Sequence, residues 1–203
     1  MERTRIALMG CLFSLLWASA FVAGKAALRH TDPISLLCAR FAVAGALMLA
    51  WACCTRPRAR WRDPLLWRDG LALGIFNNAL YLGLSFMGLR TVSPEATVLI
   101  VSTAPFFAMA LAAIGGTRCS WRQMAGVIVG FGGVYVVLAA RIQGGADLHG
   151  ALLVLLGTLS FAIGTVWYRH RAAQHDPLML NALQNLAGAL VIAPFAPHWA
   201  QAL

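Results

Sequence analysis

The first long apolar stretch of the sequence carries polar and aromatic residues at helical spacing. Ser14, Trp17, Phe21 and Lys25 follow one another at intervals of three and four, which places them on one face of a helix. Such a face could form the wall of a substrate cavity, with its two aromatic rings as a platform. It could equally be a packing surface, with the long side chain of Lys25 reaching to the edge of a membrane.

Two further apolar stretches carry amide side chains at similar spacing. Asn77 and Tyr81 lie four residues apart, so an amide and a phenol can present hydrogen-bond donors and acceptors together. Asn181 and Gln184 form a second stripe, which continues to Asn185. Either stripe could line a cavity, or it could hold helices together through hydrogen bonds that contribute about 0.6 kcal/mol each.

Three other residues are candidates because a charge or a break inside a membrane helix is costly. Arg40 lies about seven residues into its stretch and could pair with an acid or a substrate carboxylate, or reach outward to the interface. Glu95 is the only acid that we expect near the interior of an apolar stretch. It either lies in a first helical turn, stabilised by the helix dipole, or is buried and carries protons. Pro105 predicts either a hinge or a fixed bend.

No pattern in the sequence is typical of a catalytic or metal-binding motif. There is no Gly-x-Ser-x-Gly, no His-Glu-x-x-His and no phosphate-binding loop. The five cysteines lack the spacing of metal ligands, and none of the five histidines forms a helical ligand pair with an acid. We therefore expect no catalytic residue, no metal, no cofactor and no enzyme. The alternative to a transport function is a membrane scaffold or a subunit that needs a partner.

Membrane-spanning helices must position these residues, because the composition excludes a soluble protein. Apolar residues make up 60% of the 203 residues, charged residues only 11%, and the mean hydropathy is +0.73. A soluble domain carries about 25% charged residues. We predict an all-α, polytopic bundle of about seven spans, since a span needs about 20 apolar residues. The stretches are Ile6 to Gly24, Ile34 to Cys54, Gly70 to Leu89, Ala96 to Ile114, Met124 to Ala140, Leu148 to Tyr168 and Leu178 to Pro197.

The basic residues predict how the chain is threaded through the membrane. The formal net charge is +9, and with a cytoplasmic N-terminus eleven basic residues lie inside and four outside. The positive-inside rule favours this orientation. The arginine-rich segment 56–68 is then a cytoplasmic anchor, so no nucleic-acid partner is expected. Residues 1–20 also resemble a secretory signal, but the apolar run continues past Ala20.

The sequence repeats itself at an offset of 144 residues. Five predicted spans lie within one offset, so the second copy would enter the membrane from the opposite side. We therefore predict an inverted five-helix repeat, with one copy over 1–144 and an incomplete copy of about two spans over 145–203. In secondary transporters such repeats bind substrate near the midplane. The offset aligns Asp32-Pro33 with Asp176-Pro177, Trp17 with Phe161, Lys25 with Arg169, and Arg40 with Gln184.

Several motifs follow one another in a fixed order along the whole chain. They are Trp17-Ala18-Ser19-Ala20-Phe21-Val22 with Lys25; Pro33 with Arg40-Phe41; Asn77 and Tyr81; Pro105; Ser120-Trp121-Arg122-Gln123 followed by Gly126 and Gly133; and Gly150, Trp167, Pro177 and Gln184. In order and spacing they resemble the EamA-type family of the drug/metabolite transporter superfamily. Gly116-Thr117 departs from this resemblance, because the family usually has Gly-Glu there.

The resemblance implies a permease of the cell (inner) membrane that works by alternating access, commonly as an exporter of amino acids or other small metabolites. Its expected partners are the lipid bilayer and a small-molecule substrate, and a homodimer is a further possibility. The family has ten spans and this chain about seven, which leads to the hypothesis of a truncated member.

Overall fold

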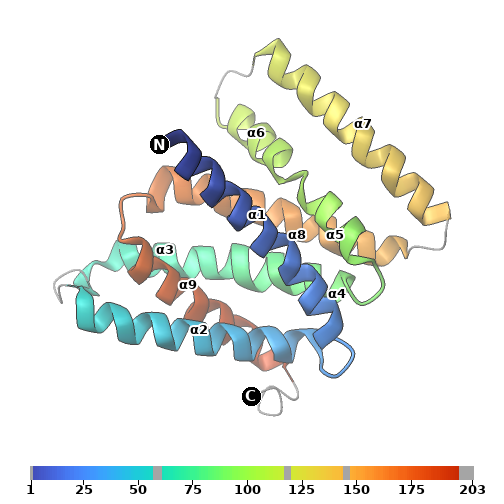
Figure 1. The fold of residues 1–203 in the computed structure, drawn as a ribbon. Coiled ribbons are helices and arrows are strands. Elements are labelled where there is room, and N and C mark those ends of the chain that lie inside the picture. The colour runs from blue at the N-terminus through green and yellow to red at the C-terminus, as the bar shows by residue number, and fades with distance from the viewer. Residues whose placement is uncertain (1, 57–60, 117–119, 144–146, 197–203) are drawn as a thin grey trace.

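The computed structural model describes residues 2–56, 61–116, 120–143 and 147–196, and within them it contains helices and turns but no strand. The elements in chain order are α1 (Glu2–Ala27), α2 (Pro33–Thr55), α3 (Pro64–Leu73), the π-helix η2 (Gly74–Leu82), α4 (Gly83–Gly88), α5 (Pro94–Val101), α6 (Ala104–Ile114), α7 (Trp121–Gln143), α8 (Leu148–Trp167), the π-helix η3 (Tyr168–Ala172), α9 (Pro177–Ile192) and the short 3₁₀-helix η4 (Ala193–Phe195) (Figure 1).

Six of the described segments are long and apolar enough to span a membrane. They are Ile6–Ala27, Pro33–Thr55, Pro64–Gly88, Pro94–Ile114, Leu148–Ala172 and Pro177–Phe195. Helix α7, with 23 residues, covers the remaining predicted stretch from Met124 to Ala140. The chain is therefore a bundle of membrane-spanning helices, and the predicted fold class is confirmed.

Aspartates begin four of the helices. The side chains of Asp32, Asp63, Asp147 and Asp176 each accept one or two backbone N–H groups of the following turn, at 2.9–3.2 Å. Proline follows three of them and suits the first helical position, where no backbone donor is needed. The Asp-Pro pairs of the repeat are thus helix starts.

Helices α2 and α9 lie side by side and run in opposite directions (Figure 1). At one end, Arg56 at the C-cap of α2 pairs with Asp176 at the N-cap of α9, with 2.9 Å between Nε and Oδ2. Toward the other end, the Cys38 thiol donates to the carbonyl of Ala189 at 3.7 Å. The helices that Asp32 and Asp176 begin are therefore antiparallel neighbours.

The third span packs closely on α9 through two glycines. A Cβ atom on Gly70 would lie 2.7 Å from the Cβ of Leu183. A Cβ atom on Gly74 would lie 2.7 Å from the Cβ of Ala187 and 2.8 Å from the carbonyl oxygen of Gln184. Since real Cβ atoms do not approach this closely, only glycine allows the two helices to lie at this distance.

The third span also differs from the prediction in its start and in its centre. We expected it to begin at Gly70, but α3 begins at Pro64, because Asp63 caps the helix and the following proline fits its first turn. In the middle of the span, the nine residues Gly74–Leu82 form a π-helix, in which each N–H donates five residues back. The sequence analysis assumed α-helical spacing here.

The fourth span is interrupted at the position of Pro105. Helices α5 and α6 are separated by Ser102 and Thr103, whose hydroxyls each donate to a carbonyl of α5 at 2.6 Å. Pro105 lies in the first turn of α6, where its missing N–H leaves no backbone bond unmade. The expected break in the helix is present between α5 and α6, and the hydroxyls of Ser102 and Thr103 supply its local hydrogen bonds.

Helix α1 crosses the bundle with most of its apolar surface exposed, as suits a helix in contact with lipid. Its last turn is held by Lys25, whose ammonium group donates to the carbonyls of Leu89, Arg90 and Val92, the latter two at 2.9 and 3.1 Å. These carbonyls lie just after α4, where a helix end leaves acceptors unpaired. Lys25 thus ties α1 to α4, in addition to any contact with the interface.

Candidate functional site

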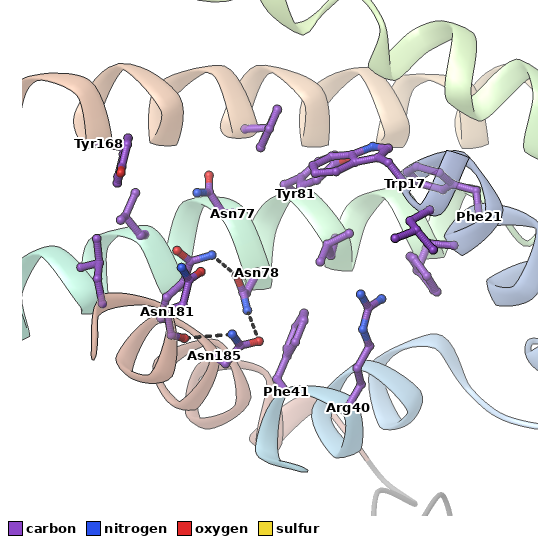
Figure 2. Close-up of a pocket in the computed structure, with 18 of the residues that line it drawn as sticks. Trp17, Phe21, Arg40, Phe41, Asn77, Asn78, Tyr81, Tyr168, Asn181 and Asn185 are labelled. Atoms are coloured by element: carbon purple, nitrogen blue, oxygen red, sulfur yellow. Dashed lines mark hydrogen bonds between the residues drawn. The ribbon is translucent and has the colours of Figure 1, made fainter. Parts of the chain in front are cut away.

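A cavity of about 520 Å³ lies between α1, α2, the third span, α8 and α9 (Figure 2). Ligand pockets for small molecules have volumes of about 300–1,000 Å³, so the cavity is of suitable size. Seven of the ten residues that the sequence singled out line it: Trp17, Phe21, Arg40, Asn77, Tyr81, Asn181 and Gln184. Residues from four sequence-distant spans therefore meet around one space.

One wall of the cavity is aromatic. The rings of Trp17 and Tyr81 are stacked, with 6.4 Å between centroids and 21° between planes. Phe161 of α8 completes the group, 5.7 Å from Trp17 and 4.7 Å from Tyr81. Figure 2 shows Trp17 and Tyr81 next to each other beneath α8. Such a surface can bind the flat, apolar part of a ligand.

The opposite wall is a chain of amides (Figure 2). Gln184 donates to the side-chain oxygen of Asn78 at 2.8 Å, and Asn78 donates to the side-chain oxygen of Asn185 at 3.2 Å. Asn185 in turn donates to the carbonyl of Asn181 at 2.9 Å. These bonds fix the amide orientations, so the wall presents donors and acceptors in set positions.

Asn77 contributes an acceptor that the protein itself does not use. Its side-chain oxygen is buried and has no hydrogen-bond partner among the residues that the structure describes. An unpaired buried acceptor costs about 1–3 kcal/mol. This oxygen faces Gly164 of α8, where an added Cβ would clash with it, so the atom is packed against the helix and is not open to the cavity.

Arg40 provides the charge of the cavity. It is the only formally charged residue that the structure places in the lining, and its side chain extends from α2 toward Trp17 and Phe21 (Figure 2). Within the described ranges no carboxylate forms an ion pair with it. Its guanidinium group is therefore available for an anionic ligand, and carboxylate is the anion that it binds with two parallel hydrogen bonds.

The remaining three candidates lie outside this cavity. Ser14 and Pro105 line a second, larger and more apolar cavity of about 1,060 Å³ between α1, the fourth span and α8, which shares Trp17 and Phe161 with the first. The Ser14 hydroxyl donates to the carbonyl of Gly10 in its own helix at 2.9 Å. Glu95 is exposed in the first turn of α5, as the structural alternative expected, and is in neither lining.

The expectation that Glu95 is the only acid near the interior of a span was wrong. Asp69 has no exposed surface and lies within the span Pro64–Gly88. Sequence reasoning missed it because we started this span at Gly70, one residue later. The signal that could have found it is Asp63-Pro64, which has the same pattern as the other two Asp-Pro helix starts.

Two lining residues also escaped the sequence analysis. Asn78 lies three residues before Tyr81, but the sequence analysis followed only the i, i+4 pair of Asn77 and Tyr81. Phe161 had been noted only as the repeat partner of Trp17. Its contact with Trp17 depends on how α1 packs against α8, and no local sequence pattern predicts that packing.

An aromatic wall, an amide wall and one arginine therefore line a cavity within a bundle of membrane-length helices. The chain belongs to the EamA-like transporter family, which matches residues 4–139. The predicted resemblance is thereby confirmed.

Individual relatives agree with this assignment. An uncharacterized transporter of Archaeoglobus fulgidus is 30% identical over 183 residues, covering 89% of this chain and 63% of its own length. Uncharacterized transporter YvbV of Bacillus subtilis is 26% identical over 95% of this chain. Uncharacterized inner membrane transporter YedA of Escherichia coli is 26% identical over 94% of this chain. The chain spans about 63% of the length of these curated relatives. Their transporter names are consistent with a protein that is not an enzyme.

A crystal structure of another protein has the same fold. It superposes with a TM-score of 0.65 and 22% sequence identity, covering 97% of this chain and 69% of the other chain. The likeness supports the arrangement of the helices in the bundle.

Proposed function

We propose that the chain forms the substrate-binding part of a permease for small organic anions, such as amino acids and related carboxylates, and that it moves them by alternating access. The observation that carries this proposal is Arg40, an unpaired cation in the lining of a cavity without acidic residues among those described. An unpaired guanidinium group in an otherwise uncharged lining favours a ligand of opposite charge.

The two walls narrow the substrate class further. A carboxylate at Arg40 would leave the rest of the ligand between the aromatic group of Trp17, Tyr81 and Phe161 and the amides of η2 and α9. The aromatic side suits a flat or apolar portion, and the amides of Asn181 and Gln184 in the lining suit a hydrogen-bond donor such as an amine. The preferred substrate is therefore a carboxylate that also carries a hydrogen-bond donor and an apolar group.

The positions of repeat-equivalent residues support alternating access. Trp17 and Phe161 are in contact, and Arg40 and Gln184 line the same cavity. Equivalent residues meet in this way when two copies are related by a two-fold axis that passes through the contact. Units 1–144 and 145–203 would then be the inverted halves that rock against each other around the site.

The charge distribution supports an orientation for this movement. With the N-terminus in the cytoplasm, the ends at Arg56, Asp63 and Asp176 face the cytoplasm, and the turn at Arg29 and His30 faces outward. In the relatives' inner membrane setting, release at the outer end corresponds to export.

Transport into vesicles tests the proposal. The purified chain, and separately a chain extended to the length of its relatives, is reconstituted in proteoliposomes and given labelled carboxylates, the matching amides and the matching amines. We expect saturable uptake of carboxylates alone, abolished in the Arg40→Gln variant and kept in Arg29→Gln, which removes an exposed arginine outside the cavity. Equal uptake of amides and carboxylates, or no uptake by either chain, contradicts the proposal.

A further inference from the structure

A buried cluster of charged groups lies just beyond one end of the cavity. Asp69 of α3, with no exposed surface, accepts hydrogen bonds from Arg68 at 2.9 Å and from the Trp167 indole at 3.3 Å through Oδ1. Its Oδ2 lies 3.0 Å from Nε2 of His175, in the connection between η3 and α9. The cluster therefore joins the third span to the end of α8 and the start of α9.

The imidazole of His175 lies between two carboxylates. Its Nε2 faces Asp69, and its Nδ1 lies 3.7 Å from Oδ2 of Asp63, the cap of α3. The side chains of His175 and Asp69 are 7% and 0% exposed, whereas that of Asp63 is 42% exposed, so the contact with Asp69 is the one shielded from water. A neutral imidazole has one N–H, so it can donate to Asp69 only by turning a lone pair toward Asp63.

A proton on His175 removes this conflict. Both ring nitrogens then carry a proton, so Nε2 donates to Asp69 and the Nδ1–H faces Asp63 across 3.7 Å as an ion pair. With a neutral ring, Asp63, Asp69 and Arg68 together carry one net negative charge, and protonation brings the group to neutrality. The buried Asp69 gains most from this neutrality, since the side chains of Asp63 and Arg68 are 42% and 43% exposed to water. The other charges near His175 are the Arg56–Asp176 ion pair and the exposed Arg169, His170 and Arg171 of η3.

The cluster is placed to close the cavity. Leu73, one helical turn after Asp69, and Tyr168, next to Trp167, both line the cavity. Figure 2 shows Tyr168 at the end remote from Phe21. Leu66, Ala172 and Met179 form a buried apolar layer around the cluster. Separation of the 173–176 connection from α3 would open this end of the cavity.

We propose that Asp63, Asp69 and His175 form a proton-binding latch that closes the Tyr168 end of the cavity. A proton on His175 holds the 173–176 connection against α3, and its release allows this end to open. The latch rests on the proposed function for its role in transport, because it would make opening of the cavity depend on pH at this side of the membrane. Opening itself requires no substrate and can be measured without one.

Thiol labelling in the absence of substrate tests the latch. Leu73→Cys, introduced after the native cysteines are replaced by alanine, puts a thiol in the cavity wall at a site that is 1% exposed. Its labelling rate by a soluble maleimide is measured in nanodiscs at about pH 5.5 and about pH 8, across the range in which histidine changes charge. The exposed Cys54, kept alone in a second protein, corrects for the chemistry of the thiol.

We expect the corrected rate to be about tenfold higher at the higher pH, because loss of the proton removes the attraction between His175 and the two carboxylates. His175→Gln should label fast at both pH values, whereas His170→Gln, which changes an exposed histidine of η3, should behave like the parent. If His175→Gln does not fold, Asp63→Asn keeps the helix cap and removes the carboxylate at Nδ1, and it should reduce the pH effect.

A pH-independent rate in the parent protein, or an unchanged pH effect in His175→Gln or Asp63→Asn, overturns the latch. The labelling experiment and the transport experiment can fail independently of each other. A chain with pH-dependent labelling but no uptake of any carboxylate keeps the latch and contradicts the proposed function. A chain that transports carboxylates but shows no pH-dependent labelling supports the proposed function and contradicts the latch.

Discussion

The rings of Trp17 and Phe161 lie 5.7 Å apart in the wall of the cavity, although 144 positions separate them in the sequence. This separation equals the offset at which the sequence matches itself. Two equivalent residues can touch only near the axis that relates the two copies. The contact therefore marks where the halves meet, and it lies beside the proposed binding site.

The first prediction concerns the direction of the two halves. His30 and Gln174 are exposed and lie in the turns that precede the Asp-Pro pairs of the first and second copy. In whole cells, a membrane-impermeant thiol reagent should label His30→Cys at once and Gln174→Cys only after permeabilisation, because an odd number of spans separates them. Labelling of both from the same side contradicts the inverted repeat.

The second prediction concerns ligand charge. Arg40→Gln should weaken binding of a carboxylate substrate by about ten- to a hundredfold, since a charged hydrogen bond contributes about 1.5–3 kcal/mol. Arg40→Lys should recover part of this loss, because lysine keeps the charge but not the planar pair of donors. Equilibrium binding to purified protein measures the effect. Equal affinity in all three proteins would exclude Arg40 from the site.

The third prediction concerns helix packing. Gly74→Ala should lower the stability by about 1–3 kcal/mol, because the added methyl group meets Ala187 and the Gln184 backbone and forces the helices apart. Gly83→Ala in the same span is the matched control, since nothing lies within 4 Å of its added Cβ. It should be neutral or stabilising by about 0.5–1 kcal/mol. Thermal unfolding in detergent measures both, and equal losses in the two variants would contradict the close packing.

The fourth prediction concerns pH. Burial would raise the pKa of Asp176, but the N–H of Met179, the charge and hydrogen bond of Arg56 and the N–H of Leu178 outweigh it, and the pKa is held below its usual range. The ion pair therefore stabilises the fold above the unfolded-state pKa of about 3.9, and this contribution is lost as the pH falls through the lower folded-state value.

Asp176→Asn keeps a good helix cap and removes the ion pair. It should lower the melting temperature by roughly 2–4 °C near neutral pH, as expected for about 1 kcal/mol, and by progressively less below about pH 4. Asp32→Asn changes the equivalent cap of α2, which has no ion pair among the described residues, and should show no such pH trend. If the melting temperatures of the parent protein and Asp176→Asn differ by the same amount at all pH values, the loss comes from the helix cap and not from the ion pair.

Much of the bundle could be predicted from local sequence. Long apolar stretches specify spans wherever they occur, and Asp-Pro pairs specify helix starts through bonds within a single turn. The stripes at Trp17, Asn77 and Gln184 were identifiable because helical spacing alone places residues on a face. Local analysis failed at Asp69, because the helix begins earlier than the apolar stretch predicts.

By itself, the sequence determined that this protein is a bundle of membrane helices with polar stripes on three of them, because hydropathy and helix capping act over a few residues. Only the tertiary structure decided that Arg40 lies in the cavity with no acidic partner among the described residues, that the stripes face one cavity, and that Asp69 and His175 meet at its end. Those facts depend on helix packing, in which glycines such as Gly74 and the widened turn of η2 set distances and rotations between segments far apart in the chain.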